Sequence, residues 1–416
     1  MVRGRLGSMR RPVRWVVRAL RSALLRGGRV VTRSRHRLPP ALDRAIETLK
    51  WCGRAPDVPP PASPAGRPAV VIGPANFAGQ GWRWARALEE HAGVAAQSWV
   101  YVTDPSFAFP DDYRVPVGIY RASAGRQRER YAALVDRVDG VVIEAGRPLF
   151  GRLFGYDPVR EAEALARDGV AAALLWHGTD IRVPSAHARE HGRSPFRDTE
   201  MSARTAALES VALRNRRRRA RFDGPTLVST PDLLLSLPDA QWCPVVVDVG
   251  TWRGAPPALE RDVPVVCHVP SNPWLKGTAL VEPALRALDA EGVISYRPAV
   301  GRTSEQVLEL YRDADIVLDQ FRLGIYGVAA CEAMAAGRVV VSSVDPAVRD
   351  VVRRRTGLEL PVVEASPDDL AATLRRILAE RDEYRRSARA GVDFVAEVHD
   401  GRRAARALQG ALRLLV

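Results

Sequence analysis

Short runs of apolar, mostly β-branched residues alternate with longer helical patterns along most of the chain. The first series of such runs is AVVIG from residue 69, VAAQSWVYV from 94, GVVIEAG from 140, AAALLWHG from 171 and TLVST from 226. Short apolar runs bounded by turn residues are typical of buried strands. Because helical segments separate these runs, the pattern predicts βαβ units and a parallel sheet.

A second series of the same kind follows: VPVVCHVPS from 263, VISYRPAV from 293, DIVLDQ from 315, RVVVSSV from 338 and LPVV from 360. Helical stretches at 278–290, 304–312, 328–336 and 367–390 intervene. The segment TWRGAPPALERD, which ends at 262, is rich in turn residues and separates the two series. We therefore expect an α/β protein with two Rossmann-like, doubly wound domains at 69–250 and 262–395, and a C-terminal helix within 396–416 that packs back on the first domain.

Residues 1–68 have a different composition. From Pro12, the sequence PVRWVVRALRSALL gathers Val and Leu on one helical face and Arg on another. A basic amphipathic helix with a Trp favours an anionic membrane surface. A basic arm that packs on the body or lacks fixed structure is the alternative, and RNA binding by this arm is a third. Residues 55–68 contain six prolines and are typical of a linker.

The formal net charge of +14 belongs to this arm. Residues 1–37 carry twelve Arg and no Asp or Glu. The rest of the chain holds 50 Lys and Arg, which is 62 in the whole chain less these twelve, against 48 Asp and Glu. The globular part is therefore nearly neutral, and we expect no nucleic-acid partner for it.

The four cysteines, Cys52, Cys243, Cys267 and Cys331, are scattered without the spacing of a metal site or a disulfide framework, so we expect them to be buried apolar residues. No apolar run reaches the roughly 18 residues that a membrane-spanning helix needs. Arginines also interrupt the only candidate for a signal peptide. The sequence predicts a cytoplasmic protein that lies, through residues 1–37, on the inner face of the cell membrane.

Ligands of open parallel sheets bind outside the carboxyl ends of the strands. After DIVLDQ comes FRLGIYGVAACEAMAAGRVVV, in which Gly324 and Gly327 precede a helix that starts near Val328. Glycines before a helix let the backbone approach a phosphate, and the free N–H groups of the first turn attract its charge. Glu332 follows within two turns, within reach of a hydroxyl of the same ligand.

The segment YGVAACEAMAAGRVVV resembles the second half of the E-x7-E region of GT-B glycosyltransferases similar to family 4 (group 1). The resemblance implies that Glu332 holds the ribose hydroxyls of a nucleotide and that Tyr326 and Gly327 belong to the donor-binding turn. The first Glu of the region falls at Gly324 and is missing. Asp319 and Gln320, at the end of the preceding strand, are candidates for polar contacts nearby.

A second segment, CHVPSNPWLKGTALVEPALRAL, is similar to the part of the same family in which a Lys-Gly pair opens a helix. The family's Lys binds the donor diphosphate, which implies this role for Lys276. The Arg that often stands five residues earlier is Ser271 here, so His268 or a backbone N–H is left to share the role. Without this context, Lys276 reads as a solvated lysine and Glu332 as an acid on a helix surface.

The first domain offers further candidates at its strand ends. Asn76, Gly79 and Gly81 form a loop after the first strand that either lines the cleft or makes a simple βα turn. His177 and Asp180 follow a later strand; they either orient an acceptor hydroxyl and accept its proton, or cap the next helix. Glu144 has a similar position. The run RNRRRRARF at 214–222 reads as a solvated helix face, or as a contact for anionic lipid or an acidic acceptor.

We therefore expect transfer of a sugar from a nucleoside diphosphate donor to the hydroxyl of a glycan or lipid-linked acceptor, in the synthesis of a surface polysaccharide or glycolipid. No DxD pair stands at a strand end, so we expect neither a metal nor any cofactor besides the co-substrate. The resemblance implies retention of the anomeric configuration. The alternative is a non-catalytic subunit of the same fold that binds a nucleotide or glycan.

Overall fold

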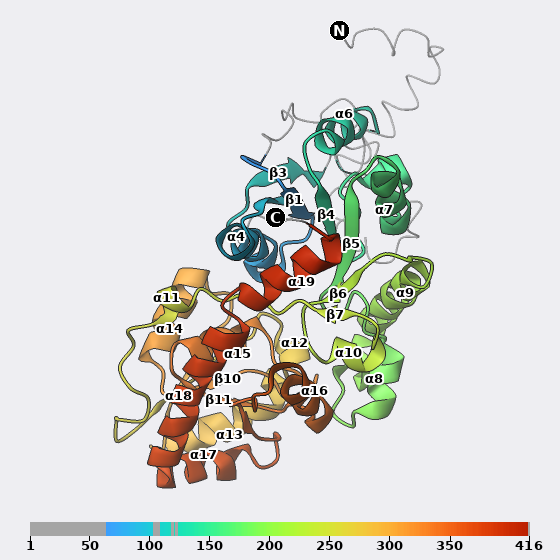
Figure 1. The fold of residues 1–416 in the computed structure, drawn as a ribbon. Helices are drawn as coiled ribbons and strands as arrows, with labels where there is room; N and C mark the ends of the chain where they lie inside the picture. Colours follow the sequence, from blue (N-terminus) through green and yellow to red (C-terminus); the bar gives the residue numbers. More distant parts are fainter. Residues whose placement is uncertain (1–63, 103–108, 118–119, 121–123, 415–416) are drawn as a thin grey trace, which may run out of the picture.

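The protein forms two α/β domains, one above the other in Figure 1. The computed structural model describes residues 64–102, 109–117, 120 and 124–414. The predicted basic arm, the predicted linker up to residue 63 and Cys52 lie outside the described residues.

The N-terminal domain is built on a parallel sheet with the strand order β3-β2-β1-β4-β5-β6-β7. Its strands are β1 (Ala69–Gly73), β2 (Ala95–Val102), β3 (Tyr113–Pro116), β4 (Gly140–Glu144), β5 (Ala171–Trp176), β6 (Thr226–Val228) and β7 (Gln241–Trp242). The predicted strands of the first series are confirmed. The sequence reading missed β3 and β7, which are the two short edge strands and lack a continuous buried run.

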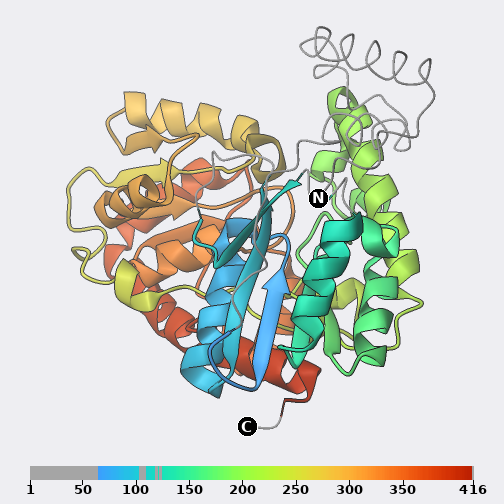
Figure 2. The ribbon, with the colours of Figure 1, turned by 90° about the horizontal axis from the view of Figure 1, so that it is seen from above.

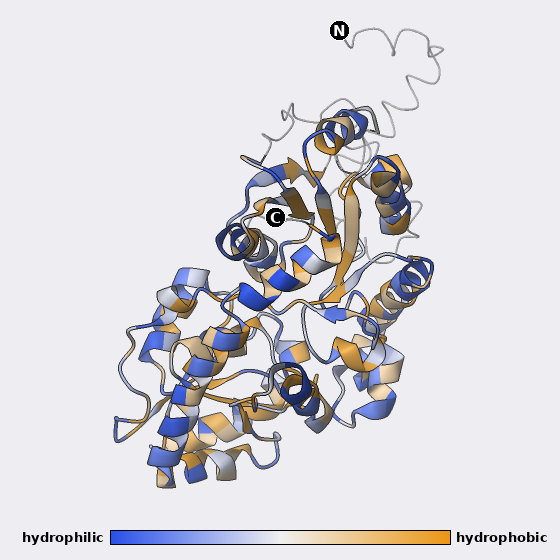
Figure 3. Ribbon diagram, in the orientation of Figure 1, coloured by the Kyte–Doolittle hydropathy of each residue, from blue (hydrophilic) through white to orange (hydrophobic). Residues whose placement is uncertain are grey.

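Helices cover both faces of this sheet (Figure 1). They are α4 (Gln80–Ala92), α6 (Ala124–Val135), α7 (Pro158–Arg167), α8 (Pro184–Glu190), α9 (Ser202–Arg219), α10 (Leu233–Ser236) and the C-terminal α19 (Arg402–Leu412). Side chains that alternate along β1 separate two cores: Val70 and Ile72 pack with α4 and α19, whereas Val71 packs with α7. Both faces are therefore buried, as in other parallel sheets, and Figure 3 shows the central strands β1, β4 and β5 as hydrophobic.

The C-terminal domain repeats the design with the strand order β12-β11-β10-β8-β9. Its strands are β8 (Val265–His268), β9 (Ser295–Pro298), β10 (Ile316–Leu318), β11 (Val339–Ser342) and β12 (Val363–Glu364). Its helices are α12 (Pro273–Lys276), α13 (Thr278–Ala290), α14 (Ser304–Asp313), α15 (Val328–Ala335), α16 (Pro346–Thr356), α17 (Leu370–Ala379) and α18 (Arg381–Val398). The helical stretch predicted at 367–390 is two helices, because the backbone leaves the helical region at Glu380.

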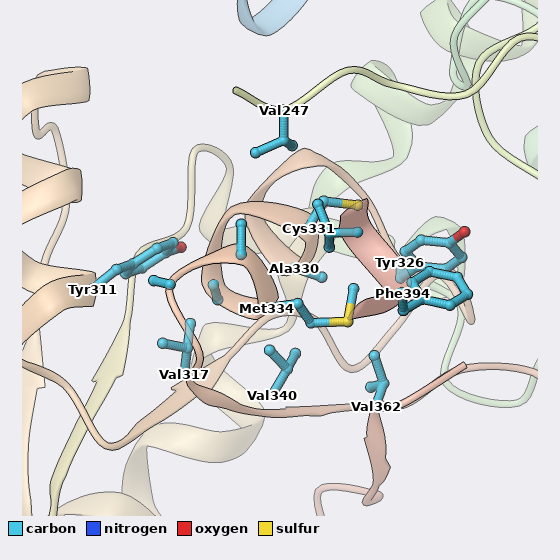
Figure 4. Close-up of a cluster of buried hydrophobic side chains, with 14 of the residues drawn as sticks. Val247, Tyr311, Val317, Tyr326, Ala330, Cys331, Met334, Val340, Val362 and Phe394 are labelled. Atoms are coloured by element: carbon cyan, nitrogen blue, oxygen red, sulfur yellow. The ribbon is translucent and has the colours of Figure 1, made fainter. Parts of the chain in front are cut away.

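The short helix α15 is packed into a hydrophobic core of the C-terminal domain. Ala330, Cys331 and Met334 are fully buried on it, against β10, β11 and α18 (Figure 4). Val247, from the segment that joins the domains, lies in the same cluster. The position of α15 relative to the first domain is therefore fixed by packing as well as by the chain connection.

The chain crosses between the domains twice, and the two crossings are bonded to each other. The N–H of Val247 donates to the carbonyl of His399 at 2.8 Å. The Gln80 amide on α4 exchanges two hydrogen bonds with the backbone of Val246, at 2.7 and 3.1 Å. The predicted linker at 250–262 comes later in the sequence than this crossing. After the second crossing, α19 returns to pack on α4 (Figure 2).

The arginine run of α9 is largely engaged within the domain. Arg216 donates to the carbonyls of Ile181 and Ser236, at 3.0 and 3.3 Å. Arg218 donates to the carbonyl of Tyr156 at 2.8 Å, and Arg219 forms an ion pair with Asp239. The reading of 214–222 as a solvated face is therefore wrong for these side chains, which bind backbone and carboxylate groups. None of the described helices is long and apolar enough to cross a membrane.

Candidate functional site

Loops at the carboxyl ends of the two sheets meet across the domain junction. Arg322, in the loop after β10, donates to both carboxylate oxygens of Asp198 at 2.7 Å, and to the carbonyls of Arg193 and Ser194 at 3.0 and 3.1 Å. The indole of Trp274 donates to the same Asp198 carboxylate at 3.0 Å. The guanidinium lowers the pKa of Asp198. We call these contacts the Arg322 clamp; they bridge the two domains.

The helix α15 lies near the domain junction, where the charge of Arg83 in the first domain acts on it. Gly327 is its N-cap, and no side chain caps the first turn. A Cβ added at Gly327 would meet nothing within 4 Å, so the space beside it is open. Free N–H groups and the positive end of the helix dipole make such a position suitable for an anion.

Glu332 lies in the second turn of α15. The residue is half-buried, and its carboxylate makes no hydrogen bond or ion pair with any residue that the structure describes. Burial raises its pKa to about 7, and the nearby Asp319 adds to this effect, whereas Arg83 and Lys276 oppose it. An unpaired carboxylate in a cleft, with a perturbed pKa, is a candidate ligand group.

Arg83 was not predicted from the sequence. It lies on α4 of the first domain, yet its charge acts on Glu332 of the second domain and on Asp248 in the crossing segment. In the described part of the chain, its guanidinium has no ion pair or hydrogen bond. Its position one helical turn after the glycine loop could have marked Arg83 as a candidate. Its effect on Glu332 could not be predicted, because Glu332 is 249 residues away in the chain.

Lys276 and Asp319, both predicted for the donor site, form an ion pair. Lys276 ends α12, whose first turn is capped by the Asn272 side chain accepting from the N–H of Leu275 at 3.3 Å. Asp319 is almost fully buried directly after β10. The buried carboxylate therefore holds the ammonium group near the start of α13, from where its charge acts on Glu332.

His268 does not have the predicted role. Its Nδ1 lies 3.0 Å from the carbonyl of Leu318 and its Nε2 lies 2.9 Å from the hydroxyl of Thr278, so both ring nitrogens are engaged. Burial lowers its pKa to about 4, which keeps the ring neutral at pH 7. A neutral, fully bonded imidazole cannot serve as a cation for a diphosphate. Ser271 is exposed in the loop between β8 and α12, and its role stays a prediction.

Tyr326 and Gly324 also differ from the prediction. Tyr326 is buried in the core beside Phe394, and its hydroxyl lies 3.3 Å from Nε2 of His399 (Figure 4). It supports the loop and does not line the cleft. Gly324 has φ +66°, and an added Cβ would lie 3.3 Å from the Cβ of Asp345. The site of the missing carboxylate is therefore a tight left-handed turn.

The loop after β1 is organised by a buried glutamate. Glu144, at the end of β4, accepts hydrogen bonds from the N–H groups of Ala75 and Asn76, both at 3.1 Å. The Asn76 side chain in turn accepts from the N–H of Trp82 at 3.1 Å, at the start of α4. A Cβ at Gly81 would lie 3.2 Å from Glu144, while Gly79 has φ +71° and caps α4. The predicted loop residues are thus brought together around Glu144.

His177 contacts the same glutamate, Glu144. Its Nε2 lies 3.1 Å from Oε1 of Glu144, close enough for an ion pair but without the alignment of a hydrogen bond. Its ring meets Phe77 edge-on at 5.1 Å and stacks on Trp84 at 5.7 Å. The other ring nitrogen, Nδ1, makes no hydrogen bond with a described residue. The orientation of the imidazole is therefore fixed on three sides, as catalysis by a histidine requires.

Asp180 positions the backbone, not the ring. Its carboxylate accepts from the N–H of His177 at 3.0 and 3.1 Å and from the N–H of Gly178 at 2.6 Å. The carboxylate that contacts the imidazole belongs to Glu144 instead. Asp180 is therefore a positioning residue of the loop after β5, and the prediction of a catalytic contact fits Glu144 better.

Among the described residues, no group of three or more His, Cys, Asp or Glu side chains is arranged to hold a metal ion.

Comparison with known proteins agrees with this geometry in the second domain. Residues 299–392, which include β10, α15 and Glu332, match the family model of glycosyl transferases group 1. No curated protein matches the sequence of the chain. The predicted resemblance is confirmed at the level of this group, and the matched residues contain the segment YGVAACEAMAAGRVVV but not the segment of Lys276.

Two solved structures illustrate the fold. Anabaena HepE, crystallised with UDP and glucose, is 12% identical, with a TM-score of 0.52 over 84% of this chain and 100% of its own. Sucrose-phosphate synthase from Thermosynechococcus elongatus is 15% identical, with a TM-score of 0.53 over 84% of this chain and 98% of its own. The chain therefore has the GT-B fold of these glycosyltransferases.

Proposed function

We propose that the chain transfers a sugar from a nucleoside diphosphate donor to an acceptor hydroxyl in the cleft between its two domains. The observation that carries the proposal is the unpaired carboxylate of Glu332 behind the open, uncapped N-terminus of α15, within the segment that matches group 1 glycosyltransferases. The structure of HepE supports a nucleoside diphosphate sugar as the donor, since it was crystallised with UDP and glucose.

The donor half of the site supplies hydrogen-bond acceptors for ribose and positive charge for the diphosphate. Ionised Glu332 accepts hydrogen bonds from the ribose hydroxyls. The first turn of α15 and Lys276 stabilise the negative charge that develops on the leaving diphosphate. Arg83 adds positive charge from the first domain. This charge compensates for Ser271 of the second domain, which stands where the family often has an Arg. These groups replace a divalent cation in the reaction that we propose.

The acceptor half contains His177. With Nε2 on Glu144, its Nδ1 is left to accept a hydrogen bond from the attacking hydroxyl and to orient it. We propose that the anomeric configuration is retained and that the leaving phosphate takes the proton of the hydroxyl. His177 then orients the acceptor and need not be a strong base.

A non-catalytic subunit is the second candidate. Gly324 supports it, because the left-handed turn at this position disfavours any side chain, and so also the carboxylate that the resemblance places there. Such a subunit binds the nucleotide sugar without turnover.

The test is a panel of nucleoside diphosphate sugars, scored by thermal shift and by release of nucleoside diphosphate. Wild type is compared with Glu332→Gln, Lys276→Ala and the control Glu309→Gln, which changes an exposed acid on α14. The proposal is supported if wild type and the control show both a thermal shift and release of nucleoside diphosphate, and the two site variants lose both. A shift without release, with every acceptor tried, favours the binding subunit, and no shift in the wild type refutes both.

We also propose a cytoplasmic location, attachment of residues 1–37 to an anionic membrane surface, and a polysaccharide or glycolipid acceptor. Deletion of residues 1–37 should then leave donor binding unchanged and weaken binding to anionic vesicles at low salt. Equal vesicle binding by both proteins would contradict the attachment.

A further inference from the structure

Phe77 and Arg147 form an exposed pair beside His177, on the first-domain side of the cleft. Phe77 belongs to the loop after β1 and is 41% exposed, although most large apolar side chains in this domain are buried. Arg147 belongs to the turn after β4, and its guanidinium carbon lies 5.1 Å from the centre of the Phe77 ring. The same ring meets His177 at 5.1 Å.

The backbone at both positions is fixed. The N–H of Arg147 donates to the carbonyl of Glu144 at 2.9 Å and closes the turn after β4. Gly146 in this turn has φ +64°, and a Cβ there would lie 2.7 Å from the Asn215 side chain, so the turn fits closely on α9. On the other side, Glu144 holds the loop that carries Phe77 through the N–H groups of Ala75 and Asn76.

The contact with Phe77 leaves Arg147 able to bind an anion. The guanidinium carbon lies over the ring, and a cation–π contact does not use up the N–H donors of a guanidinium. Within the described ranges, no carboxylate pairs with Arg147, whereas its neighbours in the domain, such as Arg182 and Arg218, pair with Asp232 and Asp157. An exposed, oriented and unpaired guanidinium matches a carboxylate or phosphate in two-point contact.

We propose that Phe77 and Arg147 form an acceptor subsite that recognises a sugar bearing a carboxylate or phosphate group, next to the hydroxyl oriented by His177. This inference rests on the proposed sugar transfer and names the chemical class of its acceptor. Phe77 contacts the apolar face of the sugar and holds the guanidinium flat, while Arg147 binds the anionic group. Neutral sugars lose the second of these contacts.

The experiment uses matched sugar probes and the full-length protein saturated with nucleoside diphosphate. Methyl glycosides of glucose, galactose and mannose are compared with the corresponding uronates and 6-phosphates, by saturation-transfer NMR and as acceptors. The variants are Arg147→Gln, Arg147→Lys and Phe77→Leu. Arg152→Gln is the control, because Arg152 is exposed in the same connection between β4 and α7 and lies outside the pair.

We expect wild type and Arg152→Gln to bind at least one anionic probe about tenfold more tightly than its neutral counterpart at low salt. Arg147→Gln should reduce this ratio to about one while leaving the neutral probe unchanged, and Arg147→Lys should keep part of it because a point charge lacks the planar two-point contact. Phe77→Leu should weaken both probes. A preference for uronates over 6-phosphates, or the reverse, identifies the anionic group.

Equal binding of charged and neutral probes, a charge preference that survives Arg147→Gln, or no binding of any anionic probe would each overturn the subsite. These results can be separated from a failure of the proposed function. If the protein still shifts with a nucleoside diphosphate sugar and releases the nucleotide, only the subsite is wrong. If that shift is absent, the donor site itself is wrong.

Discussion

The raised pKa of Glu332 predicts that a functional carboxylate lowers the stability of the protein. Burial raises this pKa from its ordinary value of 4.5 to about 7. Each pKa unit corresponds to about 1.4 kcal/mol, so holding the carboxylate ionised in the folded state costs up to about 3 kcal/mol. Glu332→Gln removes the charge and keeps the shape, so it should raise the free energy of unfolding by that amount at high pH.

The sign follows from proton linkage. Between pH 4.5 and 7 the folded protein holds a proton on Glu332 that the unfolded chain has lost. The stability that this proton contributes is complete below pH 4.5 and is lost as the pH rises through 7. The advantage of Glu332→Gln should therefore be nearly complete at pH 8.5 and fall below about 1 kcal/mol at pH 5.

Urea unfolding at these two pH values measures the difference, with Glu309→Gln as the control. Glu332→Gln should raise the stability but lower the affinity for the donor. The variant should bind a nucleoside diphosphate about tenfold to a hundredfold more weakly, because charged acceptors form the stronger hydrogen bonds. In wild type this affinity should fall as the pH drops below 7. Equal stability of Glu332→Gln and wild type at pH 8.5, or the same gain at both pH values, would refute the reasoning.

Three further changes test the rest of the site. His177→Ala should lower the transfer rate about a hundredfold with little change in donor binding, since the ring orients the acceptor; a loss confined to donor binding would contradict this role. Asp198→Ala removes the carboxylate of the Arg322 clamp, and with it the contacts to Arg322 and Trp274, and should shift the domains toward an open arrangement by about 1 kcal/mol, visible as a larger radius of gyration in X-ray scattering; an unchanged radius would show that other contacts hold the domains. Gly324→Glu should lower the melting temperature and bring no gain in activity, because a left-handed turn against Asp345 disfavours any side chain by about 1 kcal/mol or more; a stable, more active variant would show that the turn adapts.

The sequence by itself determined the two parallel-sheet domains and, in the second one, the glycine turn and the helix that begins at Val328. A strand of a parallel sheet is buried on both faces, so nearly all of its residues are apolar. Such a run can therefore be recognised in the sequence without knowledge of the rest of the fold. The glycine turn before Val328 and the acid at Glu332 could be read locally, since a helix N-terminus and the second turn after it are near neighbours in the chain. The short edge strand β7 could not, because two residues carry no periodicity.

Only the tertiary structure decided which side chains face the cleft. His268 and Tyr326 follow strands as a ligand group would, yet packing turns both inward to hydrogen-bond partners in the core. Conversely, Glu144 meets His177 although the two are 33 residues apart. Strand order, and not distance along the chain, makes β4 and β5 neighbours, and a pattern of residue types does not contain that order.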